Sequence, residues 1–290
     1  MTRGHPRQVR ATGAEALRLA IDLLRRARLA DPSGGVWEAA DLAWWWRMPR
    51  ASDTVSQRFW VDDAGPIAVA LLTAWPNTWA CDVVRVAGAD VDLHAAWSAA
   101  LAAIDQQSLS AVESLVPADD APTAALLESR GWVARETSGS GWLNAPDRPP
   151  VNPPPSGYRI VDRARRPGSV HPMVARNGPE VEARLQATGL YDPTLDLATI
   201  ASDGSVAGYA LFWNDRVTGV GLVEPMRVED AHARRGIGRA LLTTGLDRLA
   251  QAGARRLKVG WVSERARALY LAAGFRESAT LVSYAWRRPS

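Results

Sequence analysis

The pattern of apolar and polar positions predicts the same order of strands and helices in both halves of the chain. In the first half, strands are expected at residues 8–11, 58–61, 67–75, 78–86, 112–116 and 132–136, and helices at 15–29, 39–47, 93–105 and 122–130. In the second half, strands are expected at 158–162, 196–201, 206–213, 219–228, 256–262 and 281–286, and helices at about 179–187, 236–253 and 265–273. We interpret the repetition as two copies of one α/β module.

A proline-rich segment lies between the two halves. Six of the twelve residues from 145 to 156 are proline. Because proline fixes φ and lacks an N–H, neither a helix nor a central strand can continue through this segment. The sequence therefore predicts a domain at 1–144, a stiff linker at 145–156 and a second domain at 157–290.

Composition and charge exclude several classes of protein. The 290 residues are 47% hydrophobic and 22% charged, which is typical of a folded globular chain. Residues 1–150 carry a net charge of −4 and residues 151–290 a net charge of +7, so the second half is expected to hold any anionic ligand. The arginines are scattered and no nucleic-acid recognition motif occurs, so a nucleic-acid partner is not expected.

A single cysteine, Cys81, excludes an intrachain disulfide and a multi-cysteine metal site, and it is expected to be a buried apolar residue. The longest apolar run, residues 67–75, is far shorter than the roughly 20 residues that span a bilayer. We expect a cytoplasmic protein, a monomer or homodimer, with no metal and no membrane partner.

One stretch of the second half has the character of an anion site. Residues 226–242 read MRVEDAHARRGIGRALL, in which Gly236-Ile237-Gly238 begins a predicted helix. The first amides of a helix have no internal partner, the helix dipole adds positive charge there, and glycine lets a phosphate approach the backbone. Arg234, Arg235 and Arg239 add charged donors. A Rossmann fingerprint and a Walker A loop are both excluded, because position 241 is leucine and no Gly-Lys-Ser/Thr follows.

A second motif follows at 263–275, SERARALYLAAGF, with the pattern Ala266-x-x-Leu269-Tyr270-x-x-x-Gly274-Phe275. With both motifs in this order, the chain resembles the GNAT superfamily of acyl-CoA-dependent N-acyltransferases. The resemblance is strong over about residues 157–288 and weak over about 8–143. It implies two tandem modules, each a mixed, mostly antiparallel sheet flanked by helices.

The resemblance also implies roles for particular residues. The pyrophosphate of acetyl-CoA would contact the turn and helix start, at Arg234, Arg235, Gly236, Ile237, Gly238 and Arg239. The preceding strand would separate from its neighbour and pair with pantetheine through Met226, Arg227 and Val228. The Met226 amide would donate to the thioester oxygen, and Tyr270 would contact the cofactor and protonate the leaving thiolate.

The general base is left open. A free alkylammonium has a pKa of about 10, so a base is useful at neutral pH. Glu224 lies two residues before Met226, where related enzymes place such residues, but it could equally be a carboxylate paired with an arginine. Ala233, which His232 precedes, stands where the family often has arginine or glutamine, and Ser263 stands where it often has asparagine. His232 is interpreted as a surface residue or a cofactor contact.

The first copy lacks the features that carry chemistry. Leu127 occupies the position of the tyrosine, and the loop at 86–92 has no arginine, no Gly-x-Gly and two aspartates. We expect this copy not to hold coenzyme A in the usual way. It also contains the run Trp44-Trp45-Trp46, of which at least one should reach an interface or a groove, because three successive helical side chains point in different directions.

The sequence therefore favours acetyl transfer from acetyl-CoA to a primary amine, expected to be that of a small molecule, by direct attack. The tandem plan is also similar to that of mycothiol synthases, two-copy members of the same superfamily, and a protein-lysine acceptor is a further alternative. A non-catalytic acyl-CoA-binding sensor is the alternative from another class.

Overall fold

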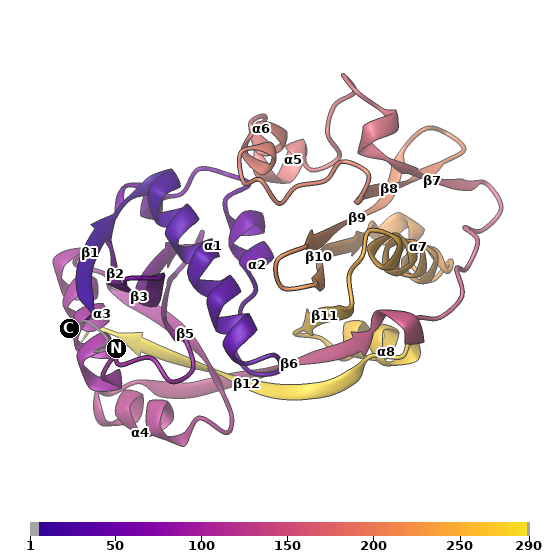
Figure 1. The fold of residues 1–290 in the computed structure, drawn as a ribbon. Coiled ribbons are helices and arrows are strands. Elements are labelled where there is room, and N and C mark those ends of the chain that lie inside the picture. Colours follow the sequence, from indigo (N-terminus) through magenta and orange to yellow (C-terminus); the bar gives the residue numbers. More distant parts are fainter. Residues whose placement is uncertain (1–5, 289–290) are drawn as a thin grey trace. The chain divides into compact units, whose positions relative to one another are not determined.

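The computed structural model describes residues 6–288 of the chain. The chain forms two compact units (Figure 1). The first contains the described residues up to Leu42, Pro49–Ser138, and those from Ala279 onward; the second contains Ala43–Met48 and Gly139–Ser278. The strands and helices of each unit are described separately below.

The sheet of the first unit has one parallel pair among antiparallel ones. Its strands are β1 (Arg7–Ala11), β2 (Gln57–Asp62), β3 (Gly65–Ala74), β4 (Trp79–Arg85), β5 (Ala111–Pro117) and the second part of β12 (Arg276–Arg287), in that spatial order. Among its described strands, only β4 and β5 run parallel. The helices are α1 (Gly13–Ala30), the first part of α2 (Ala39–Trp45), α3 (Leu93–Gln106) and α4 (Ala121–Ser129). Single-turn helices follow at Ala51–Thr54 and Ala145–Asp147, the latter in the second unit.

The second unit repeats this plan. Its sheet order is the second part of β6 (Val133–Asn144), then β11 (Arg256–Trp261), β10 (Val220–Val228), β9 (Val206–Asp215), β8 (Asp196–Ala201) and β7 (Tyr158–Asp162). Again one pair, β10 with β11, is parallel. The helices are α5 (Val174–Asn177), α6 (Val181–Gln186), α7 (Ile237–Gln251) and α8 (Glu264–Ala272), with single turns at Arg163–Arg165 and Asp230–His232. The predicted fold class is confirmed.

The final strand of each sheet comes from the other half of the sequence. Residues 139–144 of β6 pair with β11 in the second unit. Residues 281–287 of β12 pair with β5 in the first unit. The observed division thus differs from the predicted boundaries at 144 and 157, because a strand satisfies its backbone hydrogen bonds with any neighbour of suitable register. The strand expected at 132–136 is accordingly a twelve-residue strand.

The proline-rich segment has a more specific place than that of a linker. Arg148 forms an ion pair with Asp247 of α7, with 2.8 Å between Nη2 and Oδ1. The Asn152 amide donates to the Thr243 hydroxyl of α7 at 3.0 Å. These contacts attach residues 148–152 to the helix that follows the Gly-x-Gly turn.

The core of the second unit is built around α7 and the sheet. Leu241, Leu242, Leu246 and Leu249 lie on one face of α7 and are fully buried with strand residues such as Phe212. Their spacing is that of an amphipathic helix, which is why the sequence pattern located α7 well. In the first unit Cys81 is buried and unpaired with another cysteine, as predicted.

The tryptophan run contributes to the second unit. Residues 43–48 belong to that unit, in which Arg47 donates to the Asn177 side chain at 2.7 Å. The Arg184 guanidinium lies 4.0 Å from the centre of the Trp46 ring.

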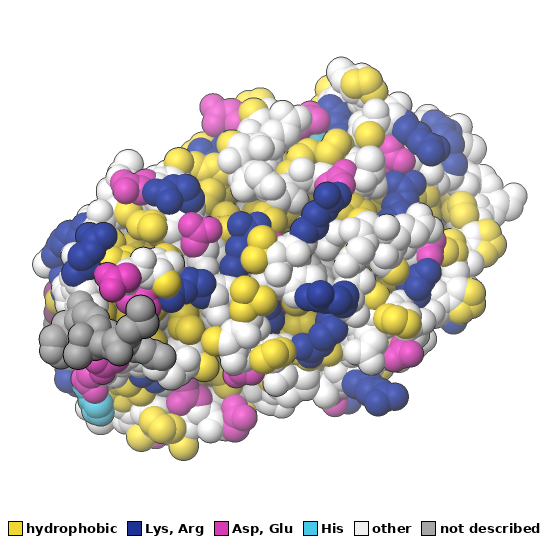
Figure 2. Space-filling view, in the orientation of Figure 1, with side chains coloured by type: hydrophobic (Ala, Val, Ile, Leu, Met, Phe, Trp, Pro, Cys, Tyr) yellow, Lys and Arg dark blue, Asp and Glu magenta, His cyan; other side chains and the backbone are white. Residues whose placement is uncertain are grey.

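On the face seen in Figure 2, basic side chains are interspersed with acidic and apolar ones. Among residues 6–288, no helix has both the length and the apolar character needed to cross a membrane.

Candidate active site

The parallel strands β10 and β11 of the second unit separate part-way along their length. Their pairing begins at Val220 with Arg256 and ends at Val223 with Val259. Strand β10 nevertheless continues to Val228, still paired with β9. The backbone of residues 224–228 therefore has one edge that the β11 ladder does not use, and that edge is available to an extended ligand.

A bulge marks the point of separation. The register between β10 and β9 shifts between Val223 and Met226, so that Val223 faces Phe212 and Met226 faces Ala210. The indole N–H of Trp213 donates to the Glu224 carbonyl oxygen at 2.5 Å. Since Trp213 is almost fully buried, this hydrogen bond fixes the backbone of the bulge from the interior of the unit.

The turn before α7 presents unpaired amides. Arg234 and Gly236 both have left-handed backbone conformations, with φ of 61° and 83°. The first intrahelical hydrogen bond runs from the Ala240 amide to the Gly236 carbonyl at 3.1 Å, so the amides of Ile237, Gly238 and Arg239 precede the helical ladder. Because the N-cap is glycine, no side chain caps these amides. Such a turn is suited to bind an anion.

Basic and aromatic side chains surround this turn. Arg234, Arg235 and Arg239 are exposed. Arg235 donates to the Tyr158 hydroxyl at 2.9 Å, and that hydroxyl lies 3.1 Å from Nδ1 of His232. A hydroxyl that accepts from arginine can donate its own proton to Nδ1. The contact holds one guanidinium beside the turn and gives His232 a place in the site.

The glycines of the turn have different surroundings. A Cβ added at Gly236 would meet only Pro155, at 3.8 Å, so the proline-rich segment reaches the turn. A Cβ at Gly238 would lie 3.5 Å from Val228 and 3.7 Å from Leu269, which are ordinary contacts. Neither glycine is required by crowding from the protein itself. Gly236 is explained by its positive φ, whereas no contact within the protein requires glycine at position 238.

Tyr270 lies on α8 and is buried, between the rings of Trp261 and Phe275, whose centres are 6.3 and 6.0 Å from its own. Burial, and then the negative charge of Glu224, raise the pKa of Tyr270 above its ordinary value. Glu224 on β10 is half-buried, and its negative charge acts on the Tyr270 phenol. The structure thus brings together the bulge and the tyrosine, which are far apart in sequence.

Comparison with known proteins now adds to this geometry. Residues 162–275 match the model of the Acetyltransferase (GNAT) family. This segment is a GNAT acetyltransferase domain. The match includes the bulge, the glycine turn and Tyr270, and the matched family is one of acetyltransferases. A search of curated proteins finds no match to the chain.

Solved structures resemble the whole chain in fold. A tandem GNAT protein from the clavulanic acid biosynthesis pathway, solved without AcCoA, is 16% identical with a TM-score of 0.69, over 98% of this chain and 99% of that one. A GCN5-related N-acetyltransferase from Sphaerobacter thermophilus is 18% identical with a TM-score of 0.65, over 98% and 96% of the two chains. A GNAT acetyltransferase from Colwellia psychrerythraea is 13% identical with a TM-score of 0.57, over 97% and 100%. The tandem arrangement is confirmed.

Next to the diverging strand of the GNAT domain, charges are paired. Arg176 forms an ion pair with Glu229 at 2.8 Å, and Arg227 approaches the same carboxylate at 3.4 Å. Burial raises the pKa of Glu229, but the hydrogen bond and charge of Arg176, together with Arg227, outweigh it and leave the pKa lowered. Glu229 therefore stays ionised, and its charge attracts the Arg227 side chain.

The first unit differs at the equivalent helix start. Helix α3 is capped by Asp92, whose carboxylate accepts from the Ala95 amide at 2.8 Å. The position available to an external anion at α7 is thus occupied at α3 by the chain's own carboxylate. Leu127, which stands where the tyrosine would be, is buried in the core of the first unit.

Sequence reasoning missed three contributors to the site of the GNAT domain. Trp213 resembles any core residue of a strand, Tyr158 any residue of a short edge strand, and Pro155 any residue of a linker. Their roles depend on contacts across 11 to 81 positions of sequence, from Trp213 to Glu224 and from Pro155 to Gly236. No local pattern signals contacts of this kind.

Proposed function

We propose that the GNAT domain binds acetyl-CoA and transfers its acetyl group to a primary amine of a small molecule. The observation that supports this most strongly is the position at which β10 leaves β11. The unused strand edge after Val223 and the uncapped amides of α7 occur in the same unit. One suits an extended amide chain and the other a diphosphate, which are the two parts of coenzyme A.

In this proposal the residues at the start of α7 hold the diphosphate. The amides of Ile237, Gly238 and Arg239 donate to its oxygens, and Arg234 and Arg235 supply charge. Gly236 keeps the turn in its left-handed conformation. The residues fit the group, because the helix start has no capping side chain and a Cβ at Gly238 would meet only ordinary contacts. Met226, Arg227 and Val228 pair with the pantetheine arm through their backbone.

The proposed chemistry is direct attack. The amine nitrogen forms a bond to the thioester carbon, and the bond from that carbon to sulfur breaks. Glu224 accepts the proton that the amine loses, directly or through water, and the Met226 amide donates to the oxygen as it gains charge. Tyr270 gives its proton to the departing thiolate. Since its pKa is raised, the phenol is protonated at neutral pH and able to do so.

Turnover measurements test the proposal. Free thiol release from acetyl-CoA is followed with a panel of small primary amines and with lysine peptides. Rapid turnover with a small amine supports the proposal, and turnover only with lysine peptides assigns a protein acceptor instead. Binding of acetyl-CoA with no turnover on any amine contradicts catalysis and favours the sensor alternative.

A further inference from the structure

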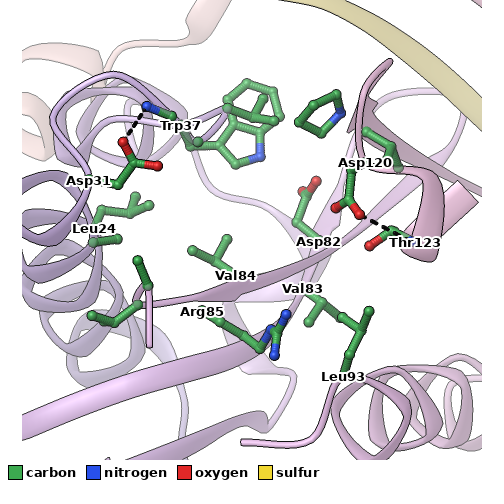
Figure 3. A pocket seen from close by; sticks show the side chains of 18 of the residues that line it. Leu24, Asp31, Trp37, Asp82, Val83, Val84, Arg85, Leu93, Asp120 and Thr123 are labelled. Carbon is green, nitrogen blue, oxygen red and sulfur yellow. Dashed lines mark hydrogen bonds between the residues drawn. The ribbon is translucent and has the colours of Figure 1, made fainter. Parts of the chain in front are cut away.

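A cavity of about 310 Å³ lies within the first unit (Figure 3). Its walls come from the second part of β4 and the loop after it, from the end of α1 and residues 34–37, and from β5. Strands β4 and β5 pair only at Trp79 with Val112 and at Ala80 with Glu113, and the cavity lies beyond that point. Its volume is in the range of small-molecule pockets, about 300–1,000 Å³.

The cavity wall contains a buried carboxyl group with an unused acceptor. Asp82 on β4 is 4% exposed. The Trp37 side chain and the Leu115 backbone hydrogen-bond to its carboxyl group, yet its Oδ2 atom has no partner among the described residues. Figure 3 shows Asp82 among the lining side chains, with Trp37 and Asp120 on either side of it in that view. A buried acceptor without a hydrogen-bond donor costs folding free energy, so a ligand that donates to Oδ2 would remove this cost.

The cationic side chains of the wall are already engaged. Arg28 forms a buried ion pair with Glu38, and it also donates to backbone carbonyl oxygens. Arg85 donates to the Val91 carbonyl oxygen at 2.9 Å. Neither group hydrogen-bonds to Oδ2 of Asp82, which has no partner among the described residues.

The other carboxylates of the wall are satisfied by backbone amides. Asp31 accepts from the Gly34 amide at 2.8 Å, and Asp120 accepts from the Thr123 amide at 3.1 Å. Among the described residues, no group of three or more His, Cys, Asp or Glu side chains is arranged to hold a metal ion. Asp82 alone among the three has an oxygen in need of a donor.

The remaining wall is largely apolar and aromatic. Leu24, Val84, Leu93 and Trp97 line the cavity together with Asp82. Hydrocarbon groups of a ligand gain free energy against such side chains, and an indole face attracts a cation. The wall as a whole suits a ligand with one charged donor and an apolar body.

We infer that this cavity binds a small organic ammonium ion, whose N–H donates to Oδ2 of Asp82 and whose apolar part lies against Leu24, Val84 and Trp97. The site is independent of the proposed acyl transfer, because its lining residues and those assigned to the chemistry belong to different units. Burial, partly offset by Trp37 and Leu115, raises the pKa of Asp82 to about 7. An ammonium ligand would lower that pKa, and its affinity should therefore rise between pH 6 and 8. The other charged groups facing this cavity are Arg28, Asp31, Arg85 and Asp120.

The test uses 2-phenylethylammonium as probe and the neutral 2-phenylethanol as its matched control, by calorimetry on the full chain without acetyl-CoA. We expect the ammonium to bind at least about 10-fold more tightly than the alcohol, as for a charge-assisted hydrogen bond. Asp82→Asn should remove that preference. Equal affinity of the two probes for the unaltered chain overturns the inference without any variant.

A control separates this cavity from the acceptor site of the GNAT domain, where an amine is also expected. The variant Glu224→Gln should leave the preference for 2-phenylethylammonium intact. A preference that survives Asp82→Asn but is lost in Glu224→Gln would place the ammonium in the second unit and overturn the inference. Failure of acetyl-CoA turnover, by contrast, bears only on the proposed function.

Discussion

The indole nitrogen of Trp213 donates to the carbonyl oxygen of Glu224 at 2.5 Å, across the bulge at which β10 departs from its parallel neighbour. The hydrogen bond joins a core side chain to the backbone that, in the proposed function, binds the thioester. It explains how β10 keeps a fixed position where it separates from β11. The geometry of the site therefore depends on a residue that does not touch the reacting atoms.

Replacement of Trp213 by phenylalanine should lower kcat about 10-fold or more, with a smaller effect on the KM for acetyl-CoA. The ring would still fill the core, but the buried Glu224 carbonyl would lose its donor, at a cost of about 1–3 kcal/mol. Steady-state kinetics measure the change. Trp286→Phe, in the first unit, is the matched control and should keep full activity. Equal kinetics for the two variants would remove Trp213 from this role.

Replacement of Tyr270 by phenylalanine should reduce kcat far more than affinity for acetyl-CoA, because the ring contacts with Trp261 and Phe275 persist while the proton is lost. Since the pKa of Tyr270 is raised, the unaltered enzyme should show no loss of rate from this group between pH 8 and pH 10. A pH–rate profile with Tyr270→Phe as reference measures this. Undiminished turnover by the variant would exclude the phenol as the acid.

Replacement of Gly238 by alanine should weaken acetyl-CoA binding about 10-fold without destabilising the fold. The new Cβ would meet only ordinary contacts with Val228 and Leu269, and alanine favours a helix by about 1 kcal/mol. A methyl group would, however, stand between the backbone and the diphosphate. Calorimetry and thermal melting measure the two effects, with Thr244→Ala on the same helix as control. Unchanged affinity in Gly238→Ala would mean that no phosphate approaches this residue.

Replacement of Arg235 by alanine should weaken acetyl-CoA binding several-fold and reduce its dependence on salt, because a charge beside the anion is lost. Arg216→Ala, which removes an equal charge from the exposed turn between β9 and β10, is the control. Titrations at low and high ionic strength measure both variants. If the two respond alike, the effect is one of net charge and the turn has no special part.

The raised pKa of Asp82 predicts that the free energy of unfolding depends on pH. Its pKa rises from 3.8 in the unfolded chain to about 7 in the folded one, chiefly through burial. Between these pH values the folded state binds the proton more tightly, so the contribution of Asp82 to stability is present at low pH and is lost as the pH rises to 7. Asp82→Asn should therefore be the more stable protein at pH 8, by up to about 4 kcal/mol, with little difference near pH 4. Urea unfolding at both pH values measures this difference, and a gap of the same size at pH 4 would refute it.

Local patterns predicted the elements of this protein well and the partners of its strands poorly. Helix α7 was located because its leucines recur on one face, and the turn before it because glycine has a distinct conformational role. The exchange of β6 and β12 between the units was missed, since alternation along a strand does not reveal its neighbour. The short helix at Val174–Asn177 was missed as well, because four residues are too few to show a helical period.

The same distinction holds for the candidate site. Arg234 to Arg239 and Tyr270 could be proposed because each lies within a compact motif. The hydrogen bond from Trp213 and the contact of Pro155 with the turn could not, because each joins segments that only the fold brings together. The buried carboxyl of Asp82 is similar, since its setting depends on α1, β4 and β5 at once.

We propose that the uncapped amides at the start of α7 bind the diphosphate of acetyl-CoA, and that only one of the two units does so. Isothermal titration of the full chain with acetyl-CoA tests it directly. The account predicts one site per chain, with binding lost or greatly weakened when Gly238 and Arg235 are replaced together. No binding heat, or a site that is unaffected by those replacements, would contradict it.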